Sequence, residues 1–137
     1  MANYKISDIE GIGPAYAEKL TSCGVRSVMA LLKKGCDKKG RKALAEATGL
    51  DESKILTWVN MADLYRISGV GSEYAELLHA AGVDTVKEMR NRNAENLHAK
   101  MAEVNSGSRR LVRQLPTLKQ VQGWVAEAKK LDPVVTH

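Results

Sequence analysis

The feature that most constrains the fold of this 137-residue chain is an internal repeat. Residues 9–32, IEGIGPAYAEKLTSCGVRSVMALL, align without a gap on residues 67–90, ISGVGSEYAELLHAAGVDTVKEMR, and 10 of the 24 aligned positions are identical. Such self-similarity is typical of a chain built from two related structural units. A looser match around Trp58 and Trp124 extends the repeat, with about eight extra residues in the second half. We expect these two tryptophans to anchor the cores of the two halves. We therefore expect one domain over 1–131, made of the halves 1–63 and 64–131, and a short tail at 132–137.

The composition favours helices over strands. Hydrophobic residues make up 44% of the chain and charged residues 27%, as in ordinary globular proteins. Alanine, leucine and lysine are common, and no segment alternates between apolar and polar residues as a half-buried strand would. Pro14 suits the start of a helix, and Gly24 and Gly82 suit helix ends. We expect an all-α fold with helices near residues 14–22, 27–34, 38–48, 52–63, 85–92, 94–104 and 118–131.

The repeat contains a glycine loop with a specific chemistry. In Ile9-Glu10-Gly11-Ile12-Gly13 the glycines permit a tight turn with positive φ, and the isoleucines tuck inward. The helix that follows then presents unpaired backbone N–H groups and the positive end of its dipole, which together suit a phosphate oxygen. The same pattern returns at Ile67-Ser68-Gly69-Val70-Gly71. The candidate contacts in the two loops are Gly11, Ile12, Gly13, Gly69, Val70 and Gly71.

These loops resemble the helix-hairpin-helix family, whose hairpins bind DNA phosphates without reading base sequence. The resemblance implies a tandem, pseudo-two-fold arrangement of two helical halves whose hairpins can grip both strands across the minor groove. The whole chain also resembles an uncharacterised bacterial family of about this length, a domain of unknown function with two such hairpins. Segments similar to Trp58–Leu64 and Leu111–Pro116 carry that second resemblance. It implies a fold but no established role.

The loop tips depart from the pattern of DNA-binding hairpins, which place Lys or Arg just after the second glycine. Here Pro14-Ala15-Tyr16 and Ser72-Glu73-Tyr74 occupy those places. The first tip is neutral and the second is acidic. A carboxylate near the start of a helix can occupy the anion site itself or repel a phosphate. Any nucleic-acid binding must therefore depend on backbone amides and on basic segments outside the loops.

Two basic segments lie elsewhere in the chain. Residues 33–50 hold six basic and two acidic residues, and residues 93–137 carry a net charge of +3 within a total of +5. Both segments suit contacts with phosphates. Alternatively, the first segment is a solvated surface near a helix end, and the arginines of the second segment pair with acidic residues on neighbouring helices. On a helix, Arg109 and Arg113 would share a face. The candidate residues are Lys33, Lys34, Lys38, Lys39, Arg41, Lys42, Arg109, Arg110 and Arg113.

Other function classes find little support in the sequence. There is no phosphate-binding P-loop, G-x-S-x-G, HExxH or clustered acidic triplet, so we expect no enzyme activity, cofactor or small-molecule substrate. Cys23 and Cys36 lack metal-ligand spacing and are expected to be free, buried thiols, with no metal site. No apolar run approaches the length of a membrane span, and the N-terminus lacks a signal peptide's apolar core. We expect a cytoplasmic protein without membrane contact.

Two functional hypotheses follow from these patterns. The favoured one is a binding module that contacts the backbone of nucleic acid, DNA in particular, without sequence specificity. The alternative is a protein-interaction adaptor that keeps the helix-hairpin-helix fold but has lost the phosphate contact. Affinity that falls steeply with salt distinguishes the first from the second.

Overall fold

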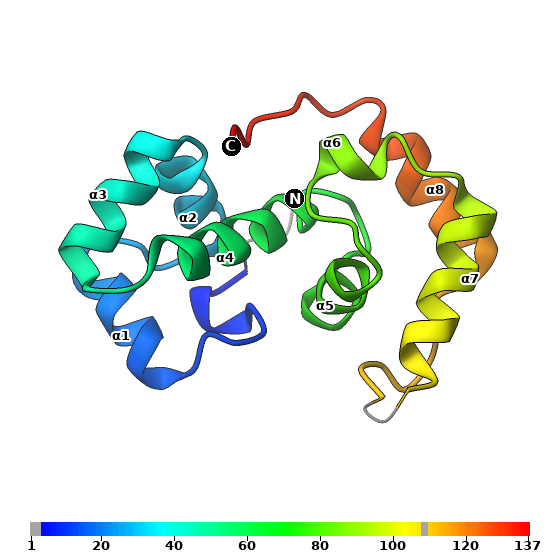
Figure 1. The fold of residues 1–137 in the computed structure, drawn as a ribbon, viewed down its shortest axis with the longest axis horizontal. Helices are drawn as coiled ribbons and strands as arrows, with labels where there is room; N and C mark the ends of the chain where they lie inside the picture. Colours follow the sequence, from blue (N-terminus) through cyan, green and yellow to red (C-terminus); the bar gives the residue numbers. More distant parts are fainter. Residues whose placement is uncertain (1–3, 108–109) are drawn as a thin grey trace. The chain divides into compact units, whose positions relative to one another are not determined.

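The computed structural model describes residues 4–107 and 110–137, and these residues form eight α-helices and one 3₁₀ helix without a strand (Figure 1). The expected all-α fold is confirmed. By their packing they form two compact units. One comprises the described residues up to Asp63 together with Val134–His137, and the other comprises Leu64–Pro133. From sequence, 132–137 is expected to be a tail; in the structure its last four residues are part of the first unit.

The first unit contains a 3₁₀ helix and four α-helices. They are η1 (Ile6–Asp8), α1 (Pro14–Ser22), α2 (Val28–Gly35), α3 (Lys38–Thr48) and α4 (Glu52–Leu64), whose last residue belongs to the second unit. Helix α2 packs on α3, and η1 packs on both α1 and α2. The Ile6 amide donates to Arg26 and the Val28 amide donates to Tyr4, which ties the start of the chain to the start of α2. The core of this unit includes Leu20, Val25, Leu31, Ile55 and Val59.

The second unit contains the other four helices. They are α5 (Ser72–Ala80), α6 (Val86–Met89), α7 (Ala94–Asn105) and α8 (Leu118–Ala128). Helix α8 packs on α6 and α7, and α5 packs on α7. The core of this unit includes Leu77, Val83, Met89, Leu97 and Val121. Aliphatic and methionine side chains therefore fill both cores, as expected for a chain without phenylalanine.

Local signals explain the helix ends. The Asp37 carboxylate accepts from the Gly40 amide at 2.7 Å and starts α3, and Gly49 with φ +75° ends it. Thr117 and Gln120 form a reciprocal capping box at the start of α8. The predicted spans of α1 and α3 agree with the structure, and the other first-unit helices agree to within one residue.

Three predictions in the second unit need correction. The helix expected over 85–92 is helical only over Val86–Met89, and α8 ends at Ala128 rather than near residue 131. The segment from Arg110 to Pro116 is not helical, so its arginines do not share a helix face. The buried Asn105 side chain explains this, because its oxygen accepts from the Leu111 and Val112 amides at 2.8 and 3.0 Å. Hydrogen bonds to a side chain take the place of helical ones there.

Candidate nucleic-acid interface

The first loop, Ile9–Gly13, is a tight turn that leads into α1. Ile9 and Ile12 are buried, and the Ile12 amide donates to the Ile9 carbonyl at 3.1 Å. Gly11 has a φ of +94°, a left-handed conformation that residues with a Cβ rarely adopt. Gly13 is the residue that caps the start of α1. The loop therefore buries its two isoleucines and exposes its glycines.

The second loop, Ile67–Gly71, has the same geometry before α5. Ile67 and Val70 are buried, and the Val70 amide donates to the Ile67 carbonyl at 3.1 Å. Gly69 has a φ of +88°, and Gly71 caps the start of α5. The same hydrogen bond and the same left-handed glycine thus occur at positions 58 residues apart. The repeated sequence pattern has its cause in this backbone geometry.

The helix that follows each loop also ends in the same way. The Val25 amide donates to the Leu20 carbonyl at 2.9 Å, and the Val83 amide donates to the Leu78 carbonyl at the same distance. A long basic side chain then covers each helix end. Lys34 donates to the Cys23 carbonyl at 3.0 Å, and Arg92 donates to the Gly82 carbonyl at 2.8 Å. Cations at these places stabilise the negative end of the helix dipole.

A tryptophan and a tyrosine pack against each loop. A Cβ at Gly11 would lie 3.5 Å from Trp58 Nε1, and a Cβ at Gly69 would lie 3.4 Å from Trp124 Nε1. The rings of Tyr16 and Trp58 have centroids 5.3 Å apart at 55°. The corresponding pair, Tyr74 and Trp124, has values of 5.2 Å and 54°. Both tryptophans are buried, which confirms that they anchor the two cores.

The first loop offers free backbone donors. In the described part of the chain the amides of Gly11, Gly13, Ala15 and Tyr16 have no hydrogen-bond acceptor. Gly11, Gly13 and Ala15 are exposed to solvent. Free N–H groups at the start of a nine-residue helix, together with the helix dipole, favour an anion. The first loop is therefore open to a ligand oxygen.

The second loop is already in contact with a carboxylate of its own unit. The Ser68 amide donates to both carboxylate oxygens of Glu127, at 3.2 and 3.1 Å, and the Ser68 hydroxyl donates to one of them at 3.3 Å. Glu73 adds a further acidic group in the first turn of α5. An anion from outside would meet two negative charges here. The acidic tip that the sequence shows is thus reinforced by a residue from α8.

The tyrosine beside the first loop contacts a lysine of α4. Lys54 donates to the Tyr16 hydroxyl at 3.0 Å, and its Nζ lies 4.8 Å from the centre of the ring. This hydrogen bond, the charge of Lys54 and, more weakly, the charge of Lys19 hold the pKa of Tyr16 below its usual value of 10.0. In the second unit the Tyr74 hydroxyl donates instead to the Gln114 carbonyl at 3.4 Å.

The first basic segment lies at the end of α2 and in α3. Four of its lysines are exposed, and their side-chain ammonium groups form no ion pair or hydrogen bond with any described residue. They are Lys33, Lys38, Lys39 and Lys42. Lys34 is also exposed but covers the end of α1, as described above. The segment therefore presents uncompensated positive charge to solvent.

Arg41 behaves differently from these lysines. It is 4% exposed, and its guanidinium donates to the Gly35 carbonyl at 2.8 Å and to the Thr136 carbonyl at 2.6 Å. The Thr136 amide donates in turn to the Cys36 carbonyl at 2.8 Å. Arg41 thus holds the C-terminal segment against the junction of α2 and α3. Its side chain is engaged within the protein and is not presented to a ligand.

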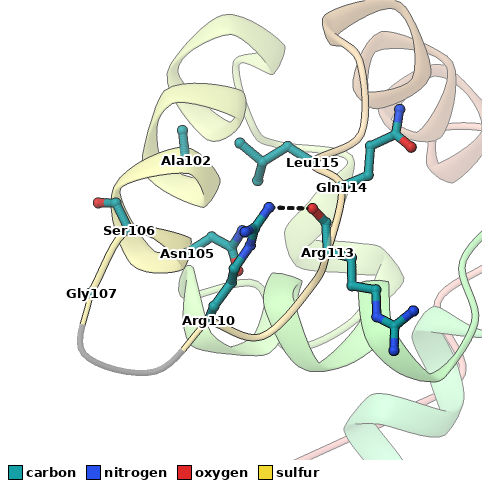
Figure 2. A pocket seen from close by; sticks show the side chains of 8 residues that line it. All are labelled: Ala102, Asn105, Ser106, Gly107, Arg110, Arg113, Gln114 and Leu115. Atoms are coloured by element: carbon teal, nitrogen blue, oxygen red, sulfur yellow. Dashed lines mark hydrogen bonds between the residues drawn. The ribbon is translucent and has the colours of Figure 1, made fainter.

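The second basic segment lies in the loop between α7 and α8. Arg110 donates to the Val112 carbonyl at 3.1 Å and to the Arg113 carbonyl, so its guanidinium is engaged within the loop (Figure 2). Arg113 is exposed, and its side chain has no hydrogen-bond partner in the described ranges. Both arginines line an open hollow of about 620 Å³ on the second unit. Arg109 lies outside the described residues.

The sequence patterns did not single out Lys54 or Glu127. A signal for both exists in the looser repeat that pairs Trp58 with Trp124. Lys54 precedes Trp58 by four residues, and Glu127 follows Trp124 by three, so each lies on the face of its helix that packs against a loop. The same alignment places Gln120 opposite Lys54. The alignment therefore marks both positions as different between the two units, but it does not give the partners of Lys54 and Glu127.

In the described ranges no helix is long and apolar enough to cross a membrane. Nor do three or more His, Cys, Asp or Glu side chains gather there as a group that could hold a metal ion. Cys23 and Cys36 are free thiols, but they are half-buried and not buried as the sequence predicts.

The chain is thus an all-helical protein of two compact units, each with a glycine loop that leads into a helix. A family model, Domain of unknown function (DUF4332), matches residues 10–131. The chain belongs to this family, which confirms the expected relationship to a domain family of unknown function. No solved structure matches the chain.

Proposed function

We propose that this protein is a non-enzymatic module that binds the backbone of nucleic acid, in particular DNA, without reading base sequence. The observation that carries the proposal is the group of four lysines without partners at the end of α2 and in α3. Neutralising phosphates with lysine releases condensed counterions and drives binding that does not depend on sequence. A solvated lysine surface without acidic partners is suited to this role.

The first loop supports the same proposal. We infer that Ile9–Gly13 and α1 act as a helix-hairpin-helix motif, with Gly11, Ile12 and Gly13 shaping the contact. Its free amides and the dipole of α1 favour a phosphate oxygen. Backbone donors bind a phosphate next to any base, so this contact is indifferent to sequence.

The contacts of the second loop indicate that the second unit has a smaller role in phosphate binding. Glu127 occupies the Ser68 amide and hydroxyl, and Glu73 lies at the first turn of α5. Of the candidate residues outside this loop, Arg113 is exposed and unpartnered, whereas Arg110 is engaged in its own loop. We therefore propose that Gly69, Val70 and Gly71 shape the second loop without contacting phosphate.

The adaptor hypothesis has one observation in its favour. The second loop keeps the backbone geometry of the first although a carboxylate binds its Ser68, as expected of a motif retained for structure. Against this, Val134 is the one large hydrophobic side chain exposed among the described residues. Protein interfaces usually have an apolar core, and aromatic and aliphatic side chains contribute it. The nucleic-acid hypothesis is therefore preferred.

Replacing three lysines tests the proposed function. We expect the wild-type protein to bind a labelled DNA duplex with a dissociation constant on the order of 1–100 µM at physiological salt. The triple variant Lys38→Gln, Lys39→Gln, Lys42→Gln should bind at least about tenfold more weakly, and the slope of log K against log salt should fall by about 2 to 3. Fluorescence anisotropy at several salt concentrations measures both quantities.

The second unit offers a control with the same change in charge. Lys119, Lys129 and Lys130 are also exposed, and replacing all three with glutamine lowers the net charge by the same amount. This control should lose clearly less affinity than the α3 variant, because local contacts and not total charge are proposed. Equal losses would argue against a site on α3. Absence of binding by the wild-type protein at ~50 mM salt would reject the nucleic-acid function and leave the adaptor.

A further inference from the structure

A chain of contacts connects the first loop to a lysine on α4. Trp58 Nε1 lies next to Gly11, the Trp58 ring contacts Tyr16, and Lys54 donates to the Tyr16 hydroxyl. Lys54 and Trp58 are four residues apart on α4, so they project from the same face of the helix. The ammonium group of Lys54 is therefore placed at the tyrosine in the first turn of α1, beside the loop whose own tip has no cation.

The second unit shows that this lysine is not required for packing. Its tyrosine and tryptophan rings meet with nearly the same distance and angle, yet Gln120 stands where the first unit has Lys54. In the 58-residue repeat, Leu77 stands where the first unit has Lys19. Two lysines are thus added to an arrangement that forms without them. A role outside folding is the simpler explanation for them.

The chemistry of the cluster matches a phosphodiester. Lys54 is exposed, has no carboxylate partner among the described residues and keeps two further protons for hydrogen bonds. The Tyr16 hydroxyl accepts from Lys54, which leaves its own proton free to donate to a second acceptor. The charges that act on this hydroxyl are those of Lys54 and Lys19, both positive. Donors of this kind suit a phosphate oxygen.

We propose that Lys54, together with the Tyr16 hydroxyl and Lys19, binds a phosphate of the nucleic-acid strand that contacts the first loop. The proposal rests on the proposed function and adds residues that supply the cation missing from the loop tip. It also assigns the phosphate contact of the glycine loops to the first unit alone. The hydroxyl of the equivalent tyrosine in the second unit donates to the Gln114 carbonyl, and no lysine among the described residues forms a hydrogen bond with it.

The test replaces Lys54 with the residue that the second unit has at that place. Lys54→Gln should weaken binding of a labelled duplex by about three- to tenfold and lower the salt slope by about 1, as for the loss of one phosphate contact. Lys119→Gln is the matched control, because Lys119 is also an exposed lysine in the first turn of a helix, α8. Tyr16→Phe keeps the ring and removes the hydroxyl, and should cause a smaller loss.

A second measurement reports on the contact without nucleic acid. The pKa of Tyr16 is held down by Lys54, so Lys54→Gln should move it back towards 10.0 while circular dichroism stays unchanged. If the pKa moves but duplex affinity changes no more than in Lys119→Gln, the phosphate role is overturned and the proposed function stands. If the wild type binds no duplex, the proposed function itself fails. Binding of poly-glutamate in place of duplex would assign the cluster to an acidic protein partner and overturn this proposal.

Discussion

At the residue scale, one glycine in each loop is required for its backbone. Gly11 and Gly69 have φ values of +94° and +88°, and each meets a tryptophan ring edge where a Cβ would stand. The left-handed φ is local to the turn and favours a residue without a Cβ, whereas a Cβ would meet the tryptophan at an ordinary van der Waals distance. The second glycine of the first loop differs, because Gly13 has an ordinary φ of −81° and open space around its Cα.

This difference gives a matched pair of substitutions. Gly11→Ala should lower the free energy of unfolding by about 1–2 kcal/mol, because alanine is strained in a left-handed conformation. Gly13→Ala should lower it by less, about 0.5 kcal/mol, because φ is ordinary and nothing is displaced, and alanine is only a poorer N-cap than glycine. Urea denaturation followed by circular dichroism measures both. Similar losses in the two variants would contradict the explanation from backbone conformation.

At the element scale, Arg41 shows how one side chain of α3 fastens a distant segment. Its bonds to the Gly35 and Thr136 carbonyls join the end of α2, α3 and the C-terminal residues. In the sequence Arg41 belongs to a dense run of cations and suggests a phosphate contact. The structure places it in the interior instead, where an unpaired guanidinium would be costly and two carbonyls satisfy it.

Arg41→Met tests this structural role. The variant should lose about 1–3 kcal/mol of stability, because two carbonyls lose a charged donor. The Thr136 amide, which donates to the Cys36 carbonyl, should exchange its hydrogen faster because the segment is no longer held. Hydrogen exchange followed by NMR measures the second effect. Lys42→Met, at the exposed neighbour, is the control and should leave Thr136 exchange unchanged.

At the scale of the whole molecule, the two units share a backbone plan but differ in charge around their loops. The first loop has Lys54 at its tyrosine, and the second has Glu127 at Ser68. The repeat therefore provides two copies of one geometry with different charged side chains in contact with them. We expect the unit with the lysines to make the phosphate contact.

Removing the Glu127 carboxylate, which contacts the second loop, should reduce this difference in charge between the two units. In Glu127→Ala the Ser68 amide and hydroxyl lose their acceptor and the loop loses a negative charge. Duplex affinity should therefore rise more than in Glu95→Ala, which removes an exposed carboxylate of the same unit. Anisotropy titrations of both variants decide the point. A rise of equal size in the two would attribute the effect to net charge alone.

Much of the fold could be predicted because its signals are local. The helix boundaries follow from caps and glycines within a few residues, as at Asp37 and Gly49 in α3. The burial of Ile9 and Ile12 follows from the loop pattern itself. The loop after α7 was predicted less well, because Asn105 satisfies the backbone of residues that lie six and seven positions further on.

The sequence by itself determined that this chain is helical, that it repeats a glycine loop before a helix, and which aromatic residues anchor the cores. These properties arise from backbone conformation and from apolar periodicity, which residues close together in the sequence determine. Only the tertiary structure decided which charged side chains are bound within the protein and which are available to a ligand. Lys54 meets Tyr16 across 38 residues, Glu127 meets Ser68 across 59, and Arg41 meets Thr136 across 95. No local pattern fixes such pairings, because they depend on where the packed helices place each side chain.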